Sequence, residues 1–353
     1  MSASRLQLMP CHDAAAWDAF VAASPQQNVF CHTPLLAALG ADYDLWFAEE
    51  AGAPVAGAVI LKRNGELLLA PHEYTMYIGL LLAQDPAPSH RSIRRHLEVC
   101  AFLTEELLHR YPLVSFCLHH TIKDVRAFQW INYHDPERGR FSIDVGYTAL
   151  LDLSACQDFD RYLSGIRMLR RRDYAKANAA GLQVAASADV ELLSDLHERT
   201  FARQGMLRPP EDGALLQNIA AAAIADEFGE LLVCSDSSGR PLAANLCLRD
   251  HRAAYYLFGA NDPASRDTGA ATLLMLEQIR RSVTRGLSIF DFVGINSPNR
   301  GDFKTSFNAV PTPYFIPTWK PAEMVGQSRC QTAGERAVHR KFAGANFLTS
   351  HSL

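Results

Sequence analysis

The sequence predicts a mixed α/β protein in which two copies of one domain follow each other. Strand-like and helix-like segments alternate along 353 residues, a length beyond what one hydrophobic core usually serves. Residues 52–63 (GAPVAGAVILKR) and 239–250 (GRPLAANLCLRD) share a Gly-x-Pro turn, a small apolar pair and a strand that ends in charged residues. An internal duplication leaves such similarity, although two hairpins can also resemble each other by chance. We therefore expect domains at 1–150 and 151–322, followed by a polar tail at 323–353.

The composition narrows the class of protein. A content of 48% hydrophobic and 20% charged residues predicts a soluble globular protein. A net charge of −4 argues against a protein that coats nucleic acid, so no DNA partner is expected. No run reaches the ~18 apolar residues of a membrane span, and the N-terminus lacks the apolar core of a signal peptide. Eight scattered cysteines without a C-x-x-C pair then predict reduced thiols and a cytoplasmic protein.

The first half alternates strands and helices. Thr33 and Pro34 mark a helix start, because Thr caps a helix and Pro fits its first position. Gly52 and Pro54 predict a turn between two strands. Strands are expected at 45–49, 55–61, 67–69, 76–82, 113–118 and 147–153, and helices at 13–22 and 89–110.

The second half repeats the pattern. Its last helix, at 268–285, has the apolar residues Leu273, Leu276 and Ile279 at a spacing of 3–4 residues, and Gly286 stands where a helix takes a left-handed stop. Other helices are expected at 154–180, 190–204 and 211–228, and strands at 230–235, 241–249, 253–259 and 288–293.

A phosphate-binding loop is predicted where the strand at 255–259 leads into the helix at 268–285. Free N–H groups and the positive end of the helix dipole point at a ligand there. Arg266 supplies fixed charge, and Gly269 lets a ligand approach the backbone, with Ala270 and Ala271 beside it. The alternative is an ordinary helix N-terminus.

The pattern Arg266-x-x-Gly269-x-Ala271 resembles the Arg/Gln-x-x-Gly-x-Gly/Ala loop of GNAT acyltransferases. In that superfamily the loop cradles the pyrophosphate of coenzyme A. The resemblance implies that Arg266, Gly269, Ala270 and Ala271 bind acyl-CoA, such as acetyl-CoA, as a co-substrate.

A second resemblance lies further along the chain. The segment IFDFVG at 289–294, followed by Phe303-Lys304-x-x-Phe307, is similar to the C-terminal signature of the FemABX-like transferases, which join two GNAT-like domains. The similarity covers roughly 17–319 and is diffuse in the first half. It implies a donor held between splayed central strands and direct attack by an amine, so the protein must position two substrates and stabilise an oxyanion.

Three residues are candidates for catalysis. Lys304 follows a strand that should end near the donor carbonyl, where an ammonium stabilises an oxyanion or holds a phosphate; the alternative is a surface lysine in a polar loop. Asp291 lies on a buried strand, so it is either paired structurally, which we prefer, or a base. His72 follows a strand and is an acid/base candidate or simply a hydrogen-bonded histidine. No His/Cys cluster has metal-ligand spacing, so no metal is expected.

Substrate contacts are expected from a basic helix and from aromatic residues. Guanidinium groups bind phosphate bidentately, so Arg167, Arg170 and Arg171 are candidates for an anion clamp, or else form a solvated basic face. FemABX-like proteins carry a similar helix, which faces the phosphates of a nucleotide-linked acceptor. The aromatic candidates for substrate contact are Tyr74, Trp130 and Tyr256.

Three functions follow from these patterns. The favoured one is an N-acyltransferase that moves an acyl group from acyl-CoA to an amine of a small or nucleotide-linked acceptor. The second is a FemABX-like transferase that takes its acyl group from aminoacyl-tRNA and forms a peptide bond. The third is a catalytically degenerate GNAT-like binding module.

Overall fold

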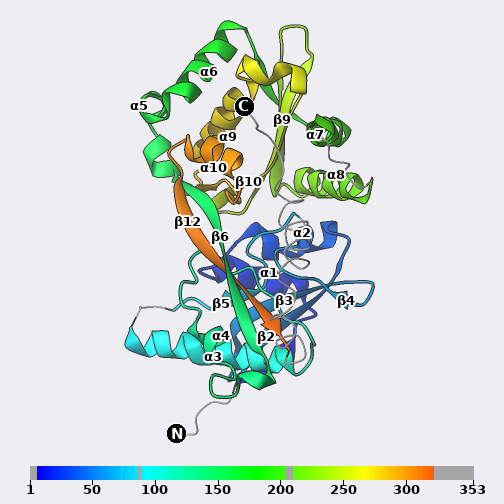
Figure 1. Cartoon of the computed structure of the whole chain (residues 1–353), viewed down its shortest axis with the longest axis vertical. Coiled ribbons are helices and arrows are strands. Elements are labelled where there is room, and N and C mark those ends of the chain that lie inside the picture. Colours follow the sequence, from blue (N-terminus) through cyan, green and yellow to red (C-terminus); the bar gives the residue numbers. More distant parts are fainter. Residues whose placement is uncertain (1–5, 73, 86–88, 204–209, 322–353) are drawn as a thin grey trace. The chain divides into compact units, whose positions relative to one another are not determined.

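The computed structural model describes residues 6–72, 74–85, 89–203 and 210–321 (Figure 1). These residues form two compact units, unit 1 at 6–146 and 313–321 and unit 2 at 147–312. The whole of the expected polar tail at 323–353 therefore lies outside the described residues. No helix within the described ranges is long and apolar enough to cross a bilayer.

The division between the units falls inside two paired strands, β6 (Arg140–Asp152) and β12 (Val310–Lys320). The expected second domain ran to residue 322, whereas residues from Pro313 count with unit 1. The reason lies in the hydrogen bonds of β12. Phe116 N donates to Pro317 O at 3.1 Å and Leu118 N donates to Phe315 O at 2.9 Å.

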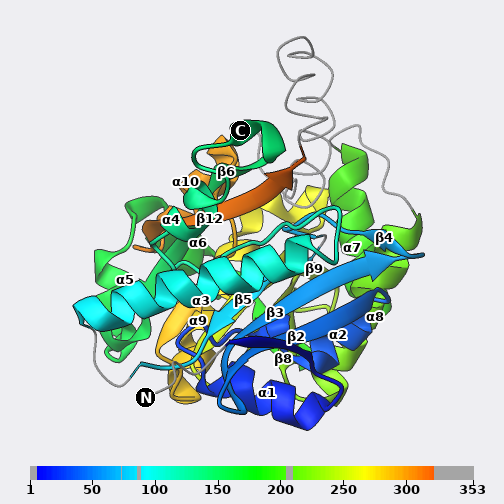
Figure 2. The same cartoon turned by 90° about the horizontal axis from the view of Figure 1, so that it is seen from below.

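Unit 1 is a five-stranded sheet covered by helices. Its order is β1-β2-β3-β4, with β5 also paired to β3. The strands are β1 (Gln7–Pro10), β2 (Asp42–Glu50), β3 (Ala53–Arg63), β4 (Glu66–Leu67) and β5 (Leu80–Leu82). The helices are α1 (Ala14–Ala23), α2 (Thr33–Ala38), α3 (His90–Leu108) and α4 (Arg126–Trp130). Figure 2 shows α3 crossing this sheet, in agreement with its contacts to β2 and β3.

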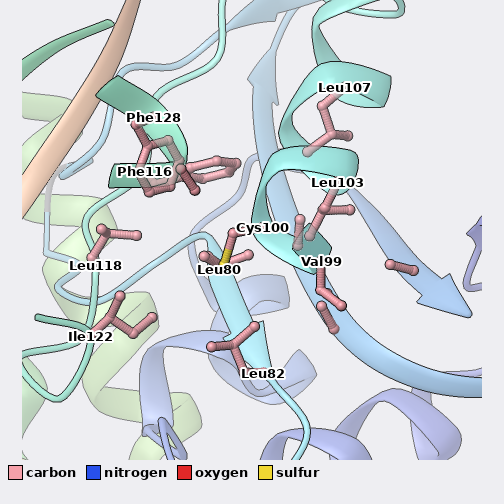
Figure 3. Packing of buried hydrophobic residues seen from close by; sticks show 14 of the residues in the cluster. Leu80, Leu82, Val99, Cys100, Leu103, Leu107, Phe116, Leu118, Ile122 and Phe128 are labelled. Carbon is pink, nitrogen blue, oxygen red and sulfur yellow. The ribbon is translucent and has the colours of Figure 1, made fainter. Parts of the chain in front are cut away.

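The core of unit 1 lies between α3 and the sheet. Figure 3 shows Leu103 and Leu107 of α3 in the same cluster as Phe116 and Phe128, whose rings are 6.1 Å apart. On α1, Trp17 stacks on Phe47 of β2 at 5.3 Å. Apolar side chains therefore pack both helices onto this sheet.

Two strands expected in unit 1 are shorter in the structure. The strand expected at 76–82 is reduced to β5, because Tyr77 (φ 52°) and Gly79 (φ 134°) leave the extended conformation. Phe116 fills the place of a side chain at Gly79, where an added Cβ would lie 2.4 Å from its ring. The segment expected as a strand at 113–118 forms an isolated bridge between Ser115 and Thr318.

Unit 2 is a seven-stranded sheet in the order β12-β6-β11-β10-β9-β8-β7. Figure 1 shows α9 on one side of β9, with α7 and α8 on the other. The additional strands are β7 (Gln183–Ser187), β8 (Gly229–Ser235), β9 (Pro241–Arg249), β10 (Ala253–Asn261) and β11 (Ile289–Asp291). The helices are α5 (Phe159–Gly165), α6 (Met168–Ala179), α7 (Val190–Arg203), α8 (Pro210–Ala225), α9 (Ala270–Thr284) and α10 (Pro298–Thr305).

The single helix expected at 154–180 is interrupted. A short 3₁₀ segment at Leu153–Cys156 precedes α5, and α6 begins only at Met168. Between α5 and α6 the buried Ile166 (ψ 165°) is extended, and Arg167 (ψ 134°) is the N-cap of α6. Arg167 therefore does not share a helical face with Arg171, as the uninterrupted helix would require.

The two hairpins that suggested a duplication also match in their irregularities. In the β2–β3 hairpin the register shifts between Ala56 and Pro54, so Val55 is an extra residue. In the β8–β9 hairpin it shifts between Ala243 and Pro241, so Leu242 is the extra residue. Each bulge directly follows the proline of the Gly-x-Pro turn. The sequence similarity thus corresponds to one local structure present in both units.

Buried thiols predict a loss of stability at alkaline pH. Burial raises the pKa of Cys31 and Cys100 from 9.0 to about 12. The native state therefore favours the protonated thiols, and this stabilisation is complete below about pH 9 and is lost as the pH rises toward 12. We expect the urea midpoint to stay constant between pH 7 and 8.5, because unfolded thiols also stay protonated below their ordinary pKa of about 8.5. The midpoint should fall at higher pH. An unchanged midpoint at pH ~10.5 would contradict this account.

Candidate active site

The central feature of unit 2 is a gap between two parallel strands. β10 and β11 pair only from Ala253 with Ile289 to Tyr255 with Asp291. β10 continues to Asn261, whereas the chain after β11 turns away at Val293 (φ 49°) and Gly294 (φ 67°). The backbone of β10 beyond Tyr255 therefore has no ladder partner on β11. Backbone groups that lack a ladder partner can bind a ligand.

A bulge lies at the mouth of the gap. In the β9–β10 ladder Tyr256 pairs with Cys247 and Phe258 pairs with Leu246, so Leu257 is an extra residue on β10. Bulges redirect side chains and are common next to active sites.

Lys304 lies beside this gap and is buried, with 6% of its surface exposed. The prediction that Lys304 lies in a polar loop is wrong, because Lys304 belongs to α10. Its Nζ donates to Val293 O at 2.6 Å and to Gly294 O at 2.9 Å. The same ammonium lies 5.4 Å from the centre of the Tyr256 ring. Both carbonyls and the aromatic face stabilise its positive charge.

Phenylalanine side chains hold the segment around Lys304. The Phe303 and Phe307 rings are 5.2 Å apart at an edge-to-face angle, and Phe307 also stacks on Phe292 at 5.8 Å. Phe292 and Phe307 are fully buried. The two phenylalanines of the Phe-Lys-x-x-Phe pattern therefore pack the end of α10 and the residues after it against the core of unit 2.

Tyr256 has the room it needs because residue 259 is glycine. A Cβ at Gly259 would lie 1.7 Å from the Tyr256 hydroxyl. Burial raises the pKa of Tyr256, so its hydroxyl stays protonated near neutral pH. Tyr256 can therefore donate a hydrogen bond in the gap, but it is a poor base there.

Asp291 is the last residue of β11 and is 1% exposed. Its Oδ1 accepts a short hydrogen bond from the Thr148 hydroxyl and a second, of 2.8 Å, from Val293 N. The carboxylate is thus engaged in holding the turn that follows β11. Sequence reasoning missed Thr148, although a polar residue in the apolar run YTALLDL was a usable signal.

The predicted phosphate loop forms the start of α9. Arg266 is exposed, Ala270 is buried and Ala271 is half-buried. Gly269 caps α9 in the left-handed conformation (φ 83°), and a Cβ there would lie 2.2 Å from the Asp173 carbonyl oxygen. The side of Gly269 where a side chain would stand therefore faces α6, so close packing requires a glycine here. The expected contact of Gly269 with a ligand stays a prediction.

The three arginines expected to form one clamp have different surroundings. Arg170 Nη1 donates to Thr272 Oγ1 at 3.0 Å and lies 3.2 Å from Asp173, while its guanidinium covers the Phe303 ring at 5.0 Å. Burial lowers the pKa of Arg170. The exposed Arg167 pairs with Asp302 at 2.6 Å. Arg171 is exposed. Arg170 thus links α6 to α9 and α10.

The other candidates belong to unit 1. His72 is buried with its Nε2 3.4 Å from Arg63 Nη2, and Tyr74 is buried at φ 62°. Trp130 is 51% exposed, lies under the Arg126 guanidinium at 5.3 Å and lines a pocket of about 380 Å³. These residues lie in a different unit from Lys304 and Asp291.

Comparisons with known proteins agree with this architecture. Residues 165–305 match the family model described as acetyltransferase (GNAT) domain. FemX has a similar structure, with a TM-score of 0.63 at 13% identity over 88% of this chain and 96% of that one. A tandem GNAT protein from the clavulanic acid biosynthesis pathway gives 0.51 at 13% identity, over 90% and 99%. No curated protein sequence matches significantly.

A third structure, the C-terminal DUF2156 domain of a putative lysylphosphatidylglycerol synthetase from Agrobacterium fabrum, gives a TM-score of 0.52 at 12% identity, covering 94% of this chain and 97% of that one. Together these findings confirm the predicted fold class, a mixed α/β protein with two GNAT-like domains. The resemblance to double-GNAT proteins of the FemABX-like type is confirmed at the level of the fold, and residues 165–305 match the model of the GNAT domain.

Proposed function

We propose that the protein transfers an acyl group to an amine in the gap between β10 and β11. The observation that carries this proposal is the separation of two parallel strands beside a buried lysine. The β10 backbone beyond Tyr255 would hold the donor carbonyl, and the acceptor amine would attack it directly. The bond from the carbonyl carbon to the amine nitrogen forms, the bond to the leaving sulfur or oxygen breaks, and the amine gives up a proton.

Lys304 would stabilise the negative charge that develops on the carbonyl oxygen. Its ammonium is already held by the carbonyls of Val293 and Gly294, so little reorganisation is needed as the reaction proceeds. Burial strengthens this electrostatic effect. Tyr256 would donate a hydrogen bond, because its raised pKa keeps it protonated.

We propose acyl-CoA as the donor. Arg266 is exposed near the start of α9, where its charge adds to the helix dipole. A family model of GNAT acetyltransferase domains covers this loop. The acceptor would be an amine on a small or nucleotide-linked molecule.

A second donor, aminoacyl-tRNA, is favoured by one feature of the same loop. The Asp173 carboxylate lies 3.1 Å from Thr272 Oγ1 in the first turn of α9, and the Asp173 backbone adjoins Gly269. The negative charge at this position, which the ion pair with Arg170 reduces, would compete with a pyrophosphate. An aminoacyl ester needs no pyrophosphate site, and exposed cations of α6, including Arg171, Arg172 and Lys176, could contact tRNA phosphates.

Calorimetry separates these donors. With acyl-CoA as donor, acetyl-CoA binds with a Kd in the range of about 1 μM to 1 mM typical of enzyme substrates, and Arg266→Ala weakens binding about tenfold. Arg280→Ala, near the opposite end of α9, is the matched control and leaves binding unchanged. Binding of uncharged tRNA that weakens steeply with salt, without acetyl-CoA binding, would instead support the aminoacyl-tRNA donor. Binding of neither ligand would contradict both.

A further inference from the structure

The segment that holds Lys304 is itself hydrogen-bonded to the part of β6 that belongs to unit 2. Ile295 N donates to Tyr147 O at 2.8 Å, and Phe292 N donates to Ala149 O at 2.9 Å. Between these two backbone bonds, the hydroxyl of Thr148 donates to Asp291 Oδ1. Residues 292–295 are thus hydrogen-bonded to the neighbours of Thr148 on either side, and the buried bond from Thr148 to Asp291 lies between these two backbone bonds.

The turn fastened in this way has a conformation that its residues resist. Val293 is β-branched and takes φ 49°, and Gly294 follows at φ 67°. A β-branched residue with positive φ is strained and persists only where its surroundings impose it. Asp291 imposes it here, because its Oδ1 accepts from Val293 N at 2.8 Å while it also holds Thr148.

The strained turn presents two carbonyl oxygens to one ammonium. The carbonyls of Val293 and Gly294 receive both hydrogen bonds given above for Lys304. In an extended strand successive carbonyls point in opposite directions, so they could not both reach one Nζ. The position of Lys304 therefore depends on the left-handed turn, and the turn depends on Asp291 and Thr148.

We infer that Asp291 and Thr148 are positioning residues for Lys304: they hold the turn at Val293–Gly294 and so place the ammonium at the gap between β10 and β11. This inference rests on the proposed catalytic role of Lys304. It also assigns Asp291 a role other than general base. In this role Asp291 supplies an acceptor oxygen, Oδ1, to Thr148 and to Val293 N.

Three substitutions and one control separate these roles. Asp291→Asn keeps the acceptor oxygen for Thr148 and Val293 N but has no basic carboxylate. Asp291→Ala removes the acceptor, and Thr148→Val removes one donor with little change in shape. Thr200→Val is the matched control, since Thr200 is also buried in unit 2 and its hydroxyl donates to Leu196 O at 2.9 Å in α7.

The first measurement needs no substrate. Competitive labelling of the full-length protein with acetic anhydride, followed by mass spectrometry, compares Lys304 with Lys62, which pairs with Asp44 in unit 1 and serves as internal reference. We expect Asp291→Ala and Thr148→Val to raise the relative labelling of Lys304 by about tenfold, because the turn opens locally. Asp291→Asn and Thr200→Val should leave it at the wild-type level. Unchanged labelling in both Asp291→Ala and Thr148→Val would overturn the inference, as would equal labelling in Asp291→Asn and Asp291→Ala.

The second measurement uses acyl transfer with the donor that calorimetry selects. Asp291→Asn should keep kcat within about threefold of wild type, whereas Asp291→Ala should lower kcat with little change in the donor KM. A loss of kcat in Asp291→Asn as large as in Asp291→Ala, with normal Lys304 labelling, would make Asp291 a base and refute the positioning role. If the labelling behaves as expected but no donor or amine supports transfer, the proposed function fails while the structural link stands.

Discussion

Replacing Lys304 with methionine should lower kcat for acyl transfer by about 10²- to 10³-fold, the usual loss when one oxyanion-stabilising donor is removed. Methionine keeps most of the volume of the side chain but cannot donate to the carbonyls of Val293 and Gly294. The donor KM should change little, because the charge acts mainly on the transition state. The measurement is steady-state transfer to a panel of amines.

Two controls make this result specific to the gap in unit 2. Lys320→Met removes an exposed lysine at the end of β12 and should leave kcat unchanged. Urea unfolding should show that Lys304→Met loses only about 1–3 kcal/mol, the penalty of leaving buried acceptors without a donor. A folded Lys304→Met protein with wild-type kcat would refute the role of Lys304 and favour a binding module without catalysis.

Replacing Gly269 with alanine should destabilise unit 2 by about 3 kcal/mol or more. The new Cβ would lie 2.2 Å from the Asp173 carbonyl oxygen, so α6 and α9 would have to separate. The left-handed conformation at φ 83° adds a further penalty of about 1–2 kcal/mol. Urea denaturation followed by circular dichroism measures the change.

The same helix supplies the control. Gly286 at the other end of α9 is also left-handed, at φ 74°, but a Cβ there would meet nothing within 4 Å. Gly286→Ala should therefore carry only the backbone penalty of about 1–2 kcal/mol. Equal effects of the two substitutions would contradict the close packing of α6 on α9. Loss of acetyl-CoA binding in a fully stable Gly269→Ala protein would support the ligand contact predicted from the sequence.

Much of the fold follows from local patterns in the sequence. The two hairpins can be predicted because each Gly-x-Pro turn separates apolar strands. In the structure the same bulge follows both turns. The helix α9 is readable because its apolar residues recur at helical spacing and Gly286 ends it. These signals depend on neighbours in sequence, so no tertiary information is needed to interpret them.

The parts that could not be predicted depend on contacts between distant segments. The break between α5 and α6 arises where Ile166 is buried, and the helical pattern around Arg167 gives no sign of it. The need for a glycine at position 269 cannot be predicted from the sequence, because it arises from contact with Asp173, about a hundred residues earlier. Thr148 and Asp291 are likewise far apart in sequence but hydrogen-bonded in the structure.

The candidate site could be predicted only in part, because some of its contacts join segments that are far apart in the sequence. Lys304, Asp291 and Tyr256 were singled out from one continuous stretch, and the structure places Lys304 next to Tyr256 and above the turn that Asp291 holds. The helix around Lys304 was missed, because a segment that contains Pro298 and Gly301 reads as a loop. His72 stays a prediction for acid/base catalysis, and Tyr74 and Trp130 stay predictions for substrate contact.

A crystal structure of the full-length protein with the acyl donor selected by calorimetry is the most direct test of the proposed site. We expect the donor carbonyl within hydrogen-bonding distance of the β10 backbone beyond Tyr255, with the Lys304 ammonium facing it across the gap to β11. A donor bound in unit 1, or in unit 2 with its carbonyl far from Lys304, would contradict the proposal that acyl transfer takes place where β10 and β11 separate.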